Sequence, residues 1–137
     1  MSVRKNQQSP NRFTVLNAAL MVYSHTALVV SNPKFEKCKR LAERIEDRAA
    51  MIYHCCRSAN EDYDNRIAEE AEIRLKLEEE AVEHCKWLKT DIRLAQKRLH
   101  LRASKCIFWN NIVNDTMKLI KAWIKTEREN LKQIHGL

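Results

Sequence analysis

Hydrophobic residues recur along this chain every three or four positions, which is the spacing of one buried helix face. The first such stripe comprises Phe13, Leu16, Leu20, Tyr23, Ala27 and Val30. The second comprises Leu41, Ile45, Ala49, Ile52, Cys56 and Ala59. The residue before a proline disfavours the helical region, and proline suits the first turn of a helix, so Ser31-Asn32-Pro33 predicts the break between them.

Two further stripes follow a run of helix-capping residues at 60–65. The third is interrupted only by Arg74 and comprises Ile67, Ala71, Leu77, Ala81, Cys85, Leu88, Ile92, Ala95 and Leu99. The fourth comprises Phe108, Ile112, Thr116, Leu119 and Trp123, widened by Ile107, Trp109 and Ile120. No glycine or proline marks the boundary between these two helices, so a break at 99–104 is inferred from length.

Four amphipathic helices with short connections predict an all-α protein, an up-down four-helix bundle. We expect a disordered basic arm at 1–11, the bundle at 12–126 and a fraying polar tail at 127–137. The first half of the third helix is very polar, so it should project into solvent or pack on another chain.

Composition supports this fold class. One glycine and two prolines among 137 residues provide too few turns for a sandwich or a barrel. The longest apolar run, 18–30, is interrupted by Ser24 and His25 and falls short of the roughly 20 residues of a membrane span. We therefore expect no membrane partner. The absence of a signal-peptide pattern and an odd count of five cysteines favour the cytoplasm.

The net charge of +7 is unevenly distributed. Residues 61–83 contain three cations and ten anions, a net charge of −7, whereas residues 84–105 contain seven cations and one anion, a net charge of +6. Acid at the start of a helix and base at its end also suit the helix dipole, so ordinary helix electrostatics is one explanation.

The basic residues also form two rows at helical spacing. Lys37, Arg40, Arg44 and Arg48 make the first, and Lys86, Lys89, Arg93 and Lys97 make the second. Several carboxylates lie near the first row, but the second has only Asp91 nearby, which leaves it less neutralised. Such a row suits contacts to a phosphate backbone, although exposed lysine-rich faces are also common on soluble helices.

No catalytic or metal site is expected. If the second and third helices fold back near residue 62 or 63, Cys55 lies opposite residue 70, roughly 22 Å from Cys85. That separation argues against a zinc site built from His54-Cys55-Cys56 and His84-Cys85. The Glu-x-x-His pairs of a di-iron bundle and a glycine-rich phosphate loop are also missing from the sequence. We expect no enzyme activity and no cofactor; the alternative from the enzyme class is a metal-dependent catalyst that uses the Cys/His pairs.

Three segments in this order resemble one family of small bacterial four-helix-bundle proteins. They are NPKFEKCKRLAERI, the run 89–95 (KTDIRLA) and LIKAWIK, and the resemblance spans most of 13–126. The family includes the accessory variability proteins (Avd) of diversity-generating retroelements and the proteins encoded in ribosomal RNA intervening sequences. The family's helix 4 segment contains glycines, which residues 117–124 of this chain lack.

The resemblance implies a homopentameric barrel with a basic surface. It also implies a non-enzymatic adaptor that binds a reverse transcriptase and its template RNA, possibly DNA, and supports mutagenic complementary DNA synthesis. Lys89 and Arg93 match basic positions of the family and are the first candidates for the binding surface, followed by Arg40, Arg44 and Arg48. The alternative is an intervening-sequence type of bundle with no transcriptase partner.

Overall fold

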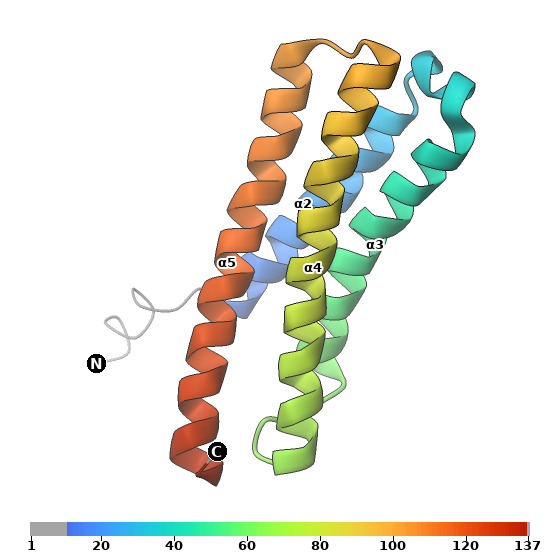
Figure 1. Ribbon diagram of the computed structural model, residues 1–137. Coiled ribbons are helices and arrows are strands. Elements are labelled where there is room, and N and C mark those ends of the chain that lie inside the picture. Colours follow the sequence, from blue (N-terminus) through green and yellow to red (C-terminus); the bar gives the residue numbers. More distant parts are fainter. Residues whose placement is uncertain (1–10, 137) are drawn as a thin grey trace.

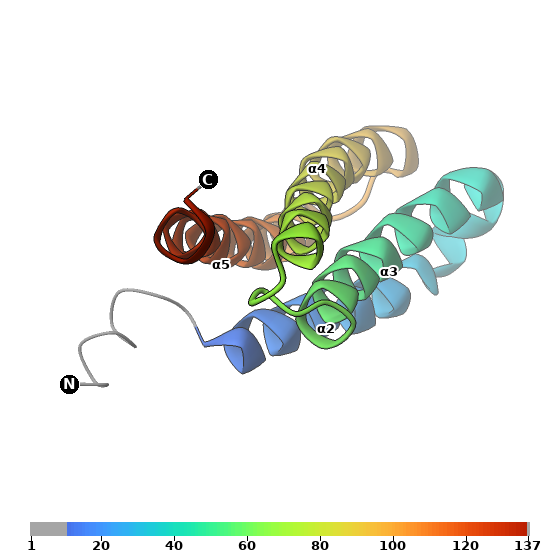
Figure 2. The ribbon, with the colours of Figure 1, turned by 90° about the horizontal axis from the view of Figure 1, so that it is seen from below.

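The computed structural model describes residues 11–136, which contain four α-helices, one 3-10 helix and no strand. The elements are α2 (Arg12–Val30), η1 (Pro33–Cys38), α3 (Lys39–Glu61), α4 (Ala68–Leu99) and α5 (Ala103–His135). The α-helices run alternately up and down (Figure 1), and each packs on two neighbours in the cyclic order α2, α3, α4, α5 (Figure 2). The predicted four-helix bundle is confirmed. Nearly all of the predicted basic arm lies outside the described residues.

Local signals in the sequence explain the helix ends. The side-chain oxygen of Asn11 accepts a hydrogen bond from the backbone N–H of Phe13 (2.8 Å), and Asn32 does the same for Lys34 (2.9 Å). Both are N-caps, which satisfy amide groups that have no partner within the helix. His100 ends α4 in the left-handed conformation at φ 53°, which confirms the predicted break at 99–104.

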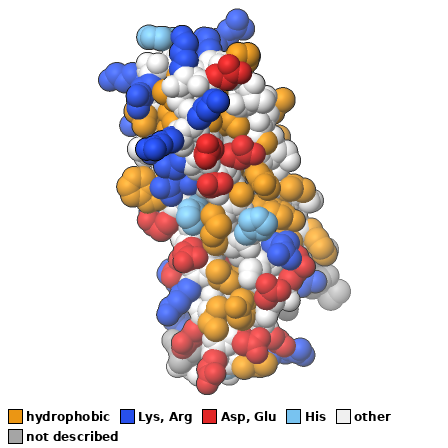
Figure 3. Space-filling model, turned by 90° about the vertical axis from the view of Figure 1, so that its right-hand side faces the viewer, with side chains coloured by type: hydrophobic (Ala, Val, Ile, Leu, Met, Phe, Trp, Pro, Cys, Tyr) orange, Lys and Arg blue, Asp and Glu red, His pale blue; other side chains and the backbone are white. Residues whose placement is uncertain are grey.

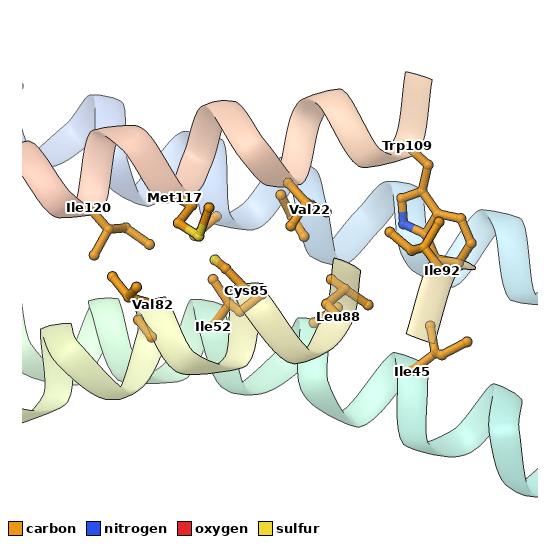
Figure 4. Close-up of a cluster of buried hydrophobic side chains, with 14 of the residues drawn as sticks. Val22, Ile45, Ile52, Val82, Cys85, Leu88, Ile92, Trp109, Met117 and Ile120 are labelled. Carbon is orange, nitrogen blue, oxygen red and sulfur yellow. The ribbon is translucent and has the colours of Figure 1, made fainter. Parts of the chain in front are cut away.

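Figure 4 shows how side chains from all four helices meet in one core. All six residues predicted for the second stripe are buried in α3. In α2 the predicted face is only partly right: Leu16, Tyr23 and Val30 pack against the core, but Phe13 is 60% exposed and Leu20 44%. The fully buried residues of α2 are instead Val15, Ala19, Val22 and Thr26. Because α2 is apolar on nearly every side, spacing alone does not identify its buried face.

One hydrogen bond helps to fix the rotation of α2 in the bundle. The indole Nε1 of Trp109 on α5 donates to Thr26 Oγ1 at 3.0 Å, and both side chains are fully buried. Helix α5 is oriented so that Trp109 faces the core, and its neighbours Ile107 and Phe108, two predicted core residues, are 60% and 51% exposed. The predicted core residue Ile67 is exposed as well, because it lies just before the first turn of α4.

The predicted fraying tail is wrong, since α5 continues as a helix to His135. Glu127 and Leu131 are buried, Glu127 pairs with Arg74 in the polar first half of α4, and Arg128 forms an ion pair with Glu79. The His135 imidazole lies 3.0 Å from the carbonyl oxygen of Asn65. The start of α4 therefore packs on the end of α5 within the same chain.

A buried charged cluster lies at this junction. Arg74 donates hydrogen bonds to Glu127 and to the backbone carbonyl of Ala59 at the end of α3 (2.8 Å), and its guanidinium lies 5.5 Å from the Trp123 ring centroid. Glu78 is fully buried beside them. Burial, with Glu127 nearby, raises the pKa of Glu78 to about 10, so this carboxyl is neutral at physiological pH.

The expectation about membrane spans needs one correction. Helix α2, at 19 residues, is long and apolar enough to cross a membrane by length and composition alone. The core helix of a soluble protein meets the same criterion, and so does a signal sequence near the N-terminus. In this structure α2 packs on α3 and α5.

Candidate nucleic-acid interface

The two predicted basic rows differ in how well they are neutralised. Asp91 of α4 is buried, and its carboxylate accepts hydrogen bonds from two arginines of α3, Arg44 (Nη2 to Oδ1, 2.8 Å) and Arg48 (Nε to Oδ2, 3.3 Å). The carboxylate therefore links α3 to α4. Arg44 and Arg48 have an anionic partner inside the protein, which reduces their capacity to bind a second one.

The other two members of the first basic row are Lys37, in η1, and Arg40, at the start of α3. Lys37 and Arg40 are exposed and make no ion pair within residues 11–136. The guanidinium of Arg48 also lies 5.3 Å from the ring centroid of Trp87, which remains 54% exposed beside it. Trp87 thus contacts the first basic row, although it is on the same helix as the second.

The α4 row has few internal partners. Lys86 pairs with Glu83 (3.2 Å), and the Nζ of half-buried Lys89 donates to the side-chain oxygen of Asn114 on α5 (3.0 Å). Arg93 and Lys97 are exposed and form no ion pair in the described part of the chain. The sequence correctly indicated that this row is the less neutralised, but the cause is the direction of Asp91, which faces α3.

Sequence reasoning missed a set of cations at the end of the bundle. The Nζ of Lys34, at the start of η1, donates to the carbonyl oxygen of His100 at 2.8 Å, which joins η1 to the α4–α5 connection. Arg98, Arg102 and Lys105 flank the same connection and are exposed. Figure 3 shows basic side chains gathered at this end of the molecule, with acidic side chains more frequent toward the other end. Their charge was counted from the sequence, but their proximity to Lys34 depends on the fold.

The cysteine and histidine pairs lie closer together than the sequence estimate placed them. Cys55 Sγ lies 3.6 Å from Glu80 Oε2, so Cys55 is opposite residue 80 and not residue 70. Residues 62–67 all belong to the connection, which moves the fold-back point later in the chain and explains part of the difference. The rest arises because Cys55 lies 6 residues before the end of α3, whereas Glu80 lies 12 residues after the start of α4, so α4 extends beyond the end of α3. No group of three metal-binding side chains is found in residues 11–136.

The thiols in this region are poorly reactive. Burial, together with the nearby Glu80 carboxylate, raises the pKa of Cys55 to about 12, and burial raises that of Cys85 to about 12. The thiolate is the nucleophilic and metal-binding form of cysteine, so these groups are protonated at neutral pH and behave as small core residues.

Comparison of the chain with protein-family models, curated proteins and solved structures gives no match.

Proposed function

We propose that this chain is a non-catalytic adaptor that binds nucleic acid through the basic row of α4 and the cations of the α4–α5 connection. The observation that carries the proposal is the pairing of Asp91 with Arg44 and Arg48. Residues 84–105 contain seven cations and one carboxylate, Asp91. Because Asp91 pairs with arginines of α3, it does not neutralise the cations of its own segment. Cations without internal partners are the groups that gain most from phosphate contacts, which release condensed counterions.

The family resemblance supplies the partners in this proposal. The chain would act in a diversity-generating retroelement, where it would hold template RNA, or DNA, beside a reverse transcriptase that performs the chemistry. A reverse transcriptase gene adjacent to paired variable and template repeats would support this version. Its absence from the gene neighbourhood would favour the intervening-sequence type of bundle, which has no transcriptase partner.

Self-association is part of the proposal. The outer face of α2 exposes Phe13, Leu20 and Met21, and α2 has no charged residue after Arg12. Exposed apolar side chains on one helix, without charged neighbours, are typical of interaction surfaces. A pentamer is the assembly that the resemblance implies, and light scattering on the purified protein would give the subunit number directly.

A charge-matched pair of variants tests the nucleic-acid surface. Arg93→Ala with Lys97→Ala removes two unpaired cations from α4, whereas Lys125→Ala with Lys132→Ala removes two exposed cations from α5 near the opposite end. We expect the first variant to weaken binding of a labelled single-stranded RNA and to lower the slope of log affinity against log salt by about one per lost phosphate contact. The second should change both quantities much less.

Circular dichroism would establish that both variants retain the helical bundle. Equal weakening in the two variants would show that binding depends on net charge alone and would contradict the assigned surface. A wild-type protein that fails to bind RNA or DNA at low salt would overturn the proposed function.

A further inference from the structure

A groove of about 820 Å³ lies between the end of α2, the start of η1 and the beginning of α5. Apolar side chains, including Leu28, Leu101 and Trp109, form its walls, and Lys34, Arg102 and Lys105 contribute its positive charge. None of its lining residues is acidic. The groove between α4 and α5 differs in this respect, since four of its lining residues are glutamates.

The cations of this α2–α5 groove are available to a ligand. Arg102 and Lys105 are exposed and form no ion pair in the part of the chain that the structure describes. Lys34 is held at the groove by its hydrogen bond to the His100 carbonyl, so its charge has a fixed position. The first turn of α5 contains no acidic residue, so nothing there opposes the positive potential. A ligand with an anionic group is therefore complementary to this groove.

An aromatic side chain completes one wall. Phe108 is 51% exposed, and the ring of His25 packs edge-on against it with 5.1 Å between ring centroids. Burial lowers the pKa of His25, so the imidazole is neutral at physiological pH and adds apolar surface without charge. Exposed aromatic rings beside basic side chains are the combination by which proteins bind single-stranded nucleic acids, because bases stack on the ring while cations contact the phosphates.

We propose that the α2–α5 groove binds one nucleotide of a single-stranded nucleic acid, with the base against Phe108 and a phosphate at Arg102 and Lys105. This inference rests on the proposed function and adds a defined binding site to it. The α4 row ends at Lys97, five residues before Arg102, so a strand that leaves the groove meets the next cations along the α4–α5 connection. The phosphate-binding row and the base-binding groove would then form one continuous path.

The experiment uses two labelled oligonucleotides of equal length, one carrying bases and one abasic, with the full-length protein. Phe108→Leu keeps apolar bulk but removes the aromatic ring, and Ile134→Leu, at a similarly exposed apolar position near the far end of α5, is the control. We expect Phe108→Leu to lower the affinity for the base-carrying oligonucleotide by about fivefold or more, because base stacking is lost. Its affinity for the abasic oligonucleotide should not change. Arg102→Gln with Lys105→Gln should weaken binding of both.

The outcomes separate this inference from the proposed function. If Phe108→Leu binds both oligonucleotides as the wild type does, while Arg93→Ala with Lys97→Ala weakens binding, the groove assignment is overturned and the proposed function stands. If the wild type binds neither oligonucleotide, both the groove assignment and the proposed function are overturned.

Laurate, an amphiphilic anion without a base, is the competing ligand class. The groove assignment is also overturned if laurate occupies the groove without displacing the oligonucleotide. Occupation would appear as a change in tryptophan fluorescence that Arg102→Gln with Lys105→Gln abolishes, because Trp109 lines the groove and the laurate carboxylate needs its cations.

Discussion

Asp91 lies on the basic half of α4, yet its carboxylate faces α3, where Oδ1 accepts a hydrogen bond from Arg44 Nη2 at 2.8 Å. Asp91 is 4% exposed, and the Arg44 side chain is about half exposed. One carboxylate thus joins two helices and also determines which cations of the surface remain unpaired. Stability and the proposed binding activity therefore depend in opposite ways on the same residue.

Asp91→Asn should separate these two effects. The amide keeps the shape of the carboxylate but loses its charge, so we expect the free energy of unfolding to fall by about 1–3 kcal/mol. Affinity for single-stranded RNA should rise, because Arg44 and Arg48 lose their internal anion. Urea unfolding and RNA titration measure the two quantities. Asp115→Asn, at an exposed position on α5, makes the same change of net charge and is the control; equal effects of the two variants would contradict the role assigned to Asp91.

The buried Glu78 carboxyl should make the protein less stable as pH rises. In the unfolded chain this group ionises near its usual pKa of 4.5, whereas in the folded protein burial, with Glu127 nearby, raises its pKa to about 10. Its contribution to stability is therefore complete below about pH 4.5 and is lost progressively as pH rises toward 10, because the folded state binds the extra proton in that window. The slope reaches at most about 1.4 kcal/mol per pH unit, the value for one proton.

Glu78→Gln should remove this dependence and stabilise the protein at pH 8 relative to the wild type. Arg74 on α4 and Glu127 on α5 are the charged groups in contact with the site, with Glu79 adjacent. Urea midpoints measured across the pH window above would test the prediction. Glu72→Gln, an exposed position on the same helix, should leave the slope unchanged. Parallel pH profiles for wild type and Glu78→Gln would show that Glu78 does not hold a proton.

Truncation after Thr126 should destabilise the bundle strongly. It removes Glu127, the partner of buried Arg74, and breaking a buried ion pair costs about 3–5 kcal/mol. It also exposes the first half of α4, so helical content should fall by more than the deleted residues account for. Truncation after Leu131 keeps both Glu127 and Leu131 and should have a much smaller effect in circular dichroism and thermal unfolding. A tail that merely frays would make the two truncations equivalent.

Helix number and most helix boundaries could be predicted from the sequence, because they depend on local signals. Asn11 and Asn32 cap helices by bonding to amides two residues away, and the α3 stripe alternates clearly with charged residues. The face of α2 could not be predicted in the same way. Its residues are apolar on nearly all sides, and the contact of Thr26 with Trp109 spans 83 residues of the chain.

The sequence by itself determined that this protein is helical and basic, and that its second row of cations on α4 has few carboxylates nearby. Those properties follow from residue spacing and charge within one helix. Only the tertiary structure shows that the Asp91 carboxylate faces α3 and that α5 covers the acidic start of α4. It also places Lys34, Arg102 and Lys105 along one groove. These relationships depend on helix rotation and on the register between helices, which side chains distant in sequence fix together when they pack.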